Sequence, residues 1–321
     1  MNINKGDIIG IIALSGDCDR DKIEKAKANI EALGYRVELS QNIFDKDRYL
    51  AGSDEVRIKE LHRFFKDDKI KIILCARGGY GAIRLINDID YDLIKNNPKP
   101  FCGFSDVTAL LLMIYKKIGI VTYHSPMAQT DFYFPTPCPL PLGTSETEQE
   151  AQTDFTNLPS HFGRRNEGEG ASSETIRTFF EVINNKKSEY KITKTYHNDD
   201  TAGILWGGNL STVVSLCGQD FIPNDDFIFF TEDLCEPVYK IDKMFQQLIN
   251  IKEFRDRCRA IILGDFSDTD NQEWLEEYFI ELAQRLNIPV VHIDGITHSE
   301  NKITLPIGVR ARIEEEKLIF E

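Results

Sequence analysis

Short apolar runs alternate with longer amphipathic segments along the first part of the chain. Three of these runs, at residues 8–14, 35–39 and 71–76, have the length and composition of strands. The segments between them place apolar residues at helical spacing, and the first ends at a helix-stopping glycine, Gly34. Strand, loop and helix in repeated order are typical of a parallel sheet with helices on its faces. The sequence therefore predicts an α/β fold.

The same alternation resumes in the later part of the chain. Strands are predicted there at residues 190–196, 226–231, 260–264 and 289–293. A chain of 321 residues with 41% hydrophobic content can form two moderate domains. The stretch between them contains four closely spaced prolines and a long polar tract. We therefore expect one domain at 1–130, a linker or flap at 131–185 and a second domain at 186–321.

The overall charge and the cysteines exclude several classes of protein. The net charge is −14, and nucleic acids and anionic membranes favour clustered Lys and Arg, so we expect neither as a partner. Seven cysteines without C-x-x-C spacing predict reduced thiols in a cytoplasmic protein, with no disulfide or zinc framework. The apolar run near the N-terminus is too short to span a membrane, and no signal-peptide pattern accompanies it.

A strand-to-helix turn is predicted at Ser105. Residues 100–104 have the pattern of a short buried strand, and the apolar run after Asp106 is too long for a strand and rich in Leu and Met. A serine at such a turn has an exposed hydroxyl beside the unpaired N–H groups of a helix N-terminus, as an acyl-transfer nucleophile requires. The alternative is an ordinary helix cap. A G-x-S-x-G elbow is absent, because Val107 stands where its closing glycine would be.

A glycine-rich loop, residues 77–81, follows the third predicted strand. Glycines allow close approach of a ligand to the backbone, so the loop suits an oxyanion hole or a phosphate cradle. It lacks the spacing of a dinucleotide site and the Lys-Ser/Thr of a P-loop. A purely structural turn is the alternative. Arg77 is the nearest cation for a substrate carboxylate, unless it serves structure.

A serine nucleophile needs a general base and an acid that orients it. His298, in a polar loop before a proline-containing turn, is the best base by position, and an exposed loop histidine is the alternative. His124 follows a strand end in the first domain and is a second candidate. Glu232 and Glu236 both follow a buried strand, and either can instead cap the next helix. The remaining histidines are expected at the surface or in the core: His62, His161, His197 and His292.

Five motifs occur in order along the chain. They are Arg77-Gly-Gly-Tyr-Gly81, Gly103-Phe-Ser-Asp-Val-Thr-Ala109, Gly207-Gly-Asn-Leu210, Glu232-Asp-Leu-Cys-Glu-Pro-Val-Tyr239 and the His298 loop ending Leu305-Pro-Ile-Gly308. Together they resemble the LD-carboxypeptidase family of serine peptidases, which includes the microcin C self-immunity peptidases. The resemblance extends over nearly the whole chain.

This resemblance implies a Ser-Glu-His triad at Ser105, Glu232 and His298, with an oxyanion hole formed by the N–H groups of Gly79 and Asp106. It implies a Rossmann-like N-terminal domain with a parallel sheet and a smaller C-terminal α/β domain with a mixed sheet. The triad is then assembled across the cleft between the domains. We further expect a homodimer that uses no metal and no cofactor.

The implied activity is that of a serine carboxypeptidase that cleaves an L-to-D peptide bond, as in removal of terminal D-Ala from muropeptide tetrapeptides during cell-wall recycling. Arg77, Gly78, Trp206 and Asn209 are the expected substrate contacts. A peptidyl-nucleotide of the microcin C type is the alternative substrate, on whose base Trp206 can stack. A non-catalytic protein that binds a small ligand, with the glycine loop holding an anion, is the alternative from another class.

Three features depart from the family pattern. Leu14-Ser15 stands where the family usually has Pro-Ser, and His124-Ser-Pro126 stands in place of His-Gly-Pro. The tract at 131–173 is long. The first two lie near the expected cleft, and together the three departures leave the substrate more open than the type of reaction.

Overall fold

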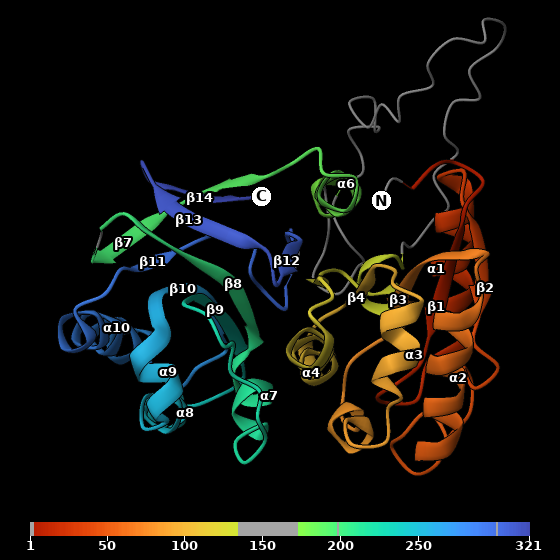
Figure 1. The fold of residues 1–321 in the computed structure, drawn as a ribbon, viewed down its shortest axis with the longest axis horizontal. Coiled ribbons are helices and arrows are strands. Elements are labelled where there is room, and N and C mark those ends of the chain that lie inside the picture. Colours follow the sequence, from red (N-terminus) through yellow and green to blue (C-terminus); the bar gives the residue numbers. More distant parts are fainter. Residues whose placement is uncertain (1–2, 134–172, 198, 300) are drawn as a thin grey trace, which may run out of the picture.

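The computed structural model describes residues 3–133, 173–197, 199–299 and 301–321. In these ranges two sheets lie side by side, each with helices packed on it (Figure 1). The predicted two-domain α/β fold is confirmed. The predicted flap falls mostly on residues outside the described ranges, as does Cys138.

The first sheet has six strands in the order β12-β5-β4-β3-β1-β2. Five of them run parallel: β1 (Ile8–Ile12), β2 (Arg36–Leu39), β3 (Ile70–Cys75), β4 (Phe101–Gly103) and β5 (Thr122–His124). The sixth, β12 (Leu305–Ile307), comes from the later part of the chain and pairs antiparallel with β5. The expected loop through residues 306–308 is therefore wrong. Pro306 is tolerated because β12 is an edge strand.

Helices cover both faces of this sheet. They are α1 (Arg20–Ala32), α2 (Asp54–Lys66), η1 (Ala82–Leu85), α3 (Tyr91–Asn96), η2 (Ser105–Val107), α4 (Thr108–Ile118), α5 (Ala128–Asp131) and α6 (Ser173–Ile183). Ile72 and Leu74 of β3 enter one core with residues of α1 and α6, whereas Ile73 and Cys75 enter the other with residues of α2 and α4. This alternation is why strands buried on both faces read as continuous apolar runs. The helix expected after the glycine loop is the short 3-10 helix η1.

The second sheet has eight strands in the order β6-β14-β13-β8-β9-β10-β11-β7. Its parallel centre consists of β8 (Thr201–Asn209), β9 (Phe227–Leu234), β10 (Cys258–Ser267) and β11 (Val290–His292). Antiparallel strands complete it: β6 (Glu189–Lys191), β7 (Lys194–His197), β13 (Arg310–Glu314) and β14 (Lys317–Phe320). The single strand expected at 190–196 is wrong, because the chain forms β6 and β7 on opposite edges. The helices are α7 (Leu210–Ser215), α8 (Val238–Ile249), α9 (Lys252–Arg257) and α10 (Gln272–Leu286).

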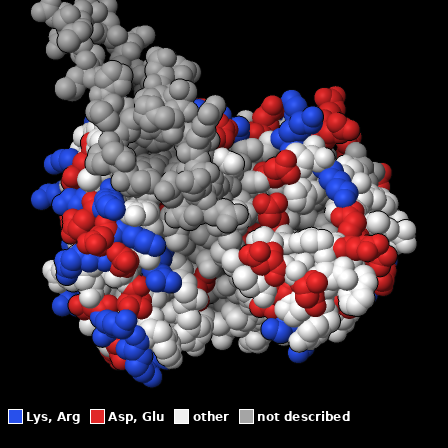
Figure 2. All heavy atoms as spheres, turned by 180° about the vertical axis from the view of Figure 1, so that it is seen from behind, with Lys and Arg blue, Asp and Glu red and all other residues white. Residues whose placement is uncertain are grey.

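The acidic excess of the sequence is visible on the molecular surface. Seen from behind, acidic side chains gather over the second half of the molecule, and acidic and basic side chains mix over the first (Figure 2). None of the helices in the described part of the chain is long and apolar enough to cross a membrane. The six cysteines in the described ranges are free: Cys75, Cys102 and Cys258 are buried, Cys18 and Cys217 are partly buried, and Cys235 is exposed.

Candidate active site

Ser105 lies just beyond β4, where the chain turns from sheet into helix through η2 and α4. Its φ is 60°, a left-handed conformation that costs a non-glycine residue about 1–3 kcal/mol. Phe104 occupies the N-cap position, and no side chain caps the helix. The Ser105 hydroxyl is half-buried and hydrogen-bonds no residue in the described ranges. The alternative of an ordinary capping serine is therefore wrong.

The glycine-rich loop runs directly against this turn. A Cβ added to Gly78 would lie 2.8 Å from Ser105 Cβ and 3.4 Å from Asp106 N. Gly79 follows with φ of 115°, which side chains rarely allow. Within the described ranges, neither the Gly79 N–H nor the Asp106 N–H has a hydrogen-bond acceptor. The Asp106 carboxylate accepts from the N–H of Ala82 at 2.9 Å, which ties the loop to the turn.

His298 lies against Glu232. The imidazole is 13% exposed, and the carboxylate, on β9, is fully buried. Nδ1 of His298 is hydrogen-bonded to Oε2 of Glu232. Because an ionised carboxylate can only accept, Nδ1 carries the proton and Nε2 keeps a lone pair, as a general base requires. Glu236, the competing candidate, pairs instead with Lys240 at 3.2 Å on α8.

Phe104 joins the two halves of the site. It precedes Ser105 in the chain, and its ring meets that of His298 edge-on with centroids 5.0 Å apart. Ser105 and His298 are therefore brought to the same place from different sheets. They are not hydrogen-bonded to each other. Catalytic hydrogen bonds are often loose before substrate binds.

His124, the second candidate base, has a different environment. It is completely buried on β5, between the rings of Phe104 and Phe230. Both of its ring nitrogens lack a partner in the described ranges. Burial, aided by the positive charge of Lys302, lowers the pKa of His124 to about 3. A buried imidazole without a carboxylate partner is a poor match for a general base.

A buried ion pair lies beneath the His298 loop. Lys302 Nζ is 3.4 Å from Asp131 at the end of α5, and both side chains are buried. The same ammonium donates to the carbonyl of Ser299 at 3.2 Å and lies 4.0 Å from the centroid of the Phe104 ring. The pair therefore attaches the His298 loop to the first half of the molecule. Sequence reasoning missed it, because the two charges are far apart in the chain and follow no motif.

Arg77 is held by backbone carbonyls. Its Nε donates to Gly78 at 3.2 Å and its Nη1 to Asp17 at 3.1 Å. No carboxylate in the described ranges forms an ion pair with it. Its Nη2 would lie 3.7 Å from a Cβ on Gly79, so an unpaired cation stands beside the glycine loop.

The two remaining predicted contacts have internal partners. Trp206 is fully buried, and its ring packs against Phe221, Phe227 and Phe229. The expected stacking of Trp206 on a ligand is therefore wrong, because both faces of its strand are covered. Asn209 caps α7 and donates to Asp233 at 2.9 Å.

No metal ligands are assigned, because no group of three or more His, Cys, Asp or Glu side chains in the described ranges is arranged to hold an ion. The polar groups that converge here are a carboxylate-bound imidazole, and a hydroxyl and two N–H groups that have no partner among the residues described. These groups are suited to acyl transfer.

Comparison with known proteins agrees with this chemistry. The LD-carboxypeptidase N-terminal domain matches residues 9–125, and the LD-carboxypeptidase C-terminal domain matches residues 202–313. A probable murein peptide carboxypeptidase of Bacillus subtilis is 32% identical, with 96% of this chain and 89% of that protein covered. The microcin C7 self-immunity protein of Escherichia coli is 27% identical, with 96% and 91% covered.

The crystal structure of muramoyltetrapeptide carboxypeptidase from Oxalobacter formigenes superposes with a TM-score of 0.76 at 26% identity, covering 98% of this chain and 97% of that one. Sequence and structure thus match over almost the full length of these proteins. The chain belongs to the LD-carboxypeptidase family.

Proposed function

We propose that this enzyme removes the terminal D-alanine from muropeptide tetrapeptides, with Ser105, His298 and Glu232 as its catalytic triad. One observation carries the assignment of the triad. The His298–Glu232 pair from the second half meets the Phe104–Ser105 turn of the first half. The substrate class rests on the relatives named for murein peptides.

In this mechanism Ser105 Oγ attacks the carbonyl carbon of the L-residue that precedes D-alanine. Nε2 of His298 accepts the hydroxyl proton and then donates it to the leaving amine of D-alanine. Water attacks the resulting ester by the same route, and the serine is regenerated. Glu232 fixes the tautomer of the imidazole and stabilises its charged form.

The negative charge that develops on the carbonyl oxygen is stabilised by the N–H groups of Gly79 and Asp106. Each such donor is worth about 10²–10³-fold in kcat in enzymes of this type. Arg77 binds the free carboxylate of the terminal D-residue, because its guanidinium lies beside the glycine loop and forms no ion pair with any acidic residue that the structure describes.

The test is release of D-alanine from L-Ala-γ-D-Glu-diamino acid-D-Ala, followed by mass spectrometry. We expect release by the wild type and none by Ser105→Ala, with the all-L peptide left intact by both. Release that persists undiminished in Ser105→Ala would remove the triad assignment.

Peptidyl-nucleotides are the alternative substrate class, favoured by the similarity to the microcin C7 self-immunity protein. Burial of Trp206 removes the aromatic contact expected for the base, although Tyr80 of the glycine loop is exposed. The two substrates, compared at equal concentration, separate these functions by their kcat/KM ratio. A non-catalytic ligand-binding protein would cleave neither.

Cytoplasmic location and a homodimer stay predictions. The oligomeric state is measurable by sedimentation of the purified chain. Fractionation of cells that produce the tagged protein measures its location.

A further inference from the structure

Arg57 on α2 is completely buried, although it carries a permanent charge. Arginine is almost never fully buried unless it is paired. Nothing in the reaction described above uses this residue.

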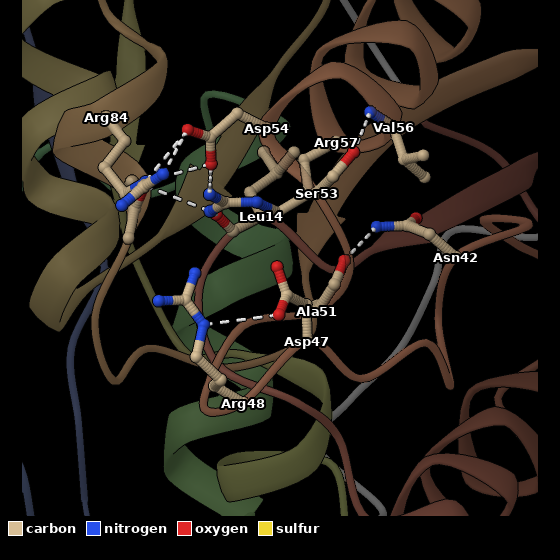
Figure 3. Close-up of polar contacts among 12 residues, drawn as sticks. Leu14, Asn42, Asp47, Arg48, Ala51, Ser53, Asp54, Val56, Arg57 and Arg84 are labelled. Atoms are coloured by element: carbon tan, nitrogen blue, oxygen red, sulfur yellow. Dashed lines mark hydrogen bonds and ion pairs between the residues drawn. The ribbon is translucent and has the colours of Figure 1, made fainter.

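Its guanidinium group makes three contacts, and Figure 3 labels two of the partners, Leu14 and Asp54. Nη1 donates to the carbonyl of Leu14 at 2.5 Å and to the carbonyl of Gly81 at 3.0 Å. Nη2 forms an ion pair with Asp54, whose carboxylate also binds Arg84 at 2.7 Å. Arg57 thus connects Leu14, two residues beyond β1, with Gly81, the last residue of the glycine loop.

The position of Gly81 matters for the site. Gly81 has φ of 125°, and a Cβ there would lie 2.8 Å from Arg57 Nη1. The next residue, Ala82, donates its N–H to the carboxylate of Asp106, beside the nucleophile. At the other end of the loop, Gly16 N–H donates to the carbonyl of Gly78 at 3.2 Å.

We infer that Arg57 is a positioning residue: it holds the glycine loop so that the Gly79 N–H points at the oxyanion. The kinetic part of this inference rests on the proposed function. Lysine cannot replace it, because a single ammonium does not reproduce a planar fork that serves two carbonyls and a carboxylate. Misplacement of a catalytic group by about 1 Å costs on the order of 10²-fold in rate.

The chain offers a matched control on the same helix. Arg63 also lies on α2 and forms ion pairs with Glu38 of β2 and Glu60 of α2, but makes no hydrogen bond to the glycine loop. We compare Arg57→Lys, Arg57→Met and Arg63→Lys with the wild type, and use the thermal midpoint to establish that each is folded.

The first measurement does not depend on the substrate. Amide hydrogen exchange of a peptide covering residues 77–85 is expected to be about tenfold faster in Arg57→Lys, and unchanged in Arg63→Lys. Unchanged exchange in Arg57→Lys overturns the inference, whatever the enzyme acts on. If Arg57→Met fails to fold, Arg57→Lys alone decides the result.

The second measurement is D-alanine release from the tetrapeptide. For Arg57→Lys we expect kcat to fall about 10- to 100-fold while KM stays within about threefold, because the oxyanion is bound only in the transition state. A raised KM with normal kcat, or an equal loss in Arg63→Lys, overturns the inference. A wild type that releases no D-alanine instead contradicts the proposed function and leaves the exchange result standing.

Discussion

The turns at Ser105 and Asn209 occupy equivalent places in the two sheets. Each follows a parallel strand, and each leads into a helix, α4 in the first sheet and α7 in the second. Asn209 has an ordinary φ of −62° and its side chain caps the helix. Ser105 has a left-handed φ and caps nothing. The two turns are in contact, because the Asn209 N–H donates a hydrogen bond to Thr108 Oγ1 at 3.4 Å.

The difference is that one strand-to-helix turn stabilises its helix, whereas the other leaves the side chain that we propose as the nucleophile without a capping role. The Asn209 side chain accepts from Thr212 N–H at 3.1 Å and donates to Asp233, so its hydrogen-bonding groups are used. The Ser105 turn has no side-chain cap and a strained backbone, and its hydroxyl forms no hydrogen bond within the described ranges. Strain of this kind is typical of functional sites.

Glu232 and Asp233 are consecutive on β9 and have different partners. Replacement of each acid by its amide gives the largest expected effect. Glu232 binds His298, whereas Asp233 accepts from Ser211 N–H at 2.8 Å and from Asn209. We expect Glu232→Gln to lower kcat about 10³–10⁴-fold through loss of the correct tautomer. Asp233→Asn should instead lower the thermal midpoint and leave kcat within about fivefold. Equal kinetic losses from both variants would contradict the division of roles.

Removal of the cap tests the stability side of the comparison. Asn209→Ala loses the helix cap and removes one of the hydrogen bonds to the buried Asp233, which keeps that from Ser211 N–H, so we expect a cost of about 1–3 kcal/mol in the free energy of unfolding. Urea titration measures it. Ser105→Ala serves as the control, with activity lost and stability retained. A kinetic loss in Asn209→Ala larger than its stability loss explains would assign Asn209 to the substrate site.

The histidine beside the serine turn makes stability depend on pH. The pKa of His124 is lowered to about 3 in the folded protein. Between pH 6.5 and 3 the unfolded state therefore binds a proton that the folded state does not, and stability falls as the pH falls. From pH 7 to pH 5 this amounts to about 2 kcal/mol for a histidine with an ordinary unfolded pKa. Over the same pH range, the free energy of unfolding of His124→Phe should fall by that much less than that of the wild type, as measured by urea titration. A pH dependence identical to that of the wild type would contradict the assignment to His124.

The strain itself gives the smallest effect. Ser105→Gly relieves the left-handed backbone, whereas Ser105→Ala keeps it, and both lack the hydroxyl. We expect the glycine variant to be more stable than the alanine variant by about 1 kcal/mol, measured by thermal unfolding. The reverse order would show that the turn is not strained.

The local sequence pattern was sufficient to predict much of the fold and the candidate site residues. The parallel units follow from apolar runs and glycine stops, and the free serine from a strand that ends before a long apolar helix. Position alone left Glu232 and Glu236 open, because the choice depends on which of them faces His298 across the sheet.

The features that the sequence pattern did not predict depend on contacts between residues far apart in the chain. Trp206 lies in a strand buried on both faces, where alternation does not reveal exposure. Arg57 belongs to none of the motifs in the sequence, and Lys302 pairs with Asp131 from another region. The three residues of β12 are too few to show a period, and one of them is proline.

Strand β12 also bears on when the enzyme becomes active during synthesis. Until it emerges from the ribosome, β5 has an uncovered edge, and His298, which precedes β12, is not in place. A nascent chain carries Ser105, the proposed nucleophile, long before it carries His298, the proposed base. If the proposed triad is correct, hydrolysis requires this late segment. A product truncated before β12 would then expose the unpaired edge of β5 to aggregation and lack peptidase activity.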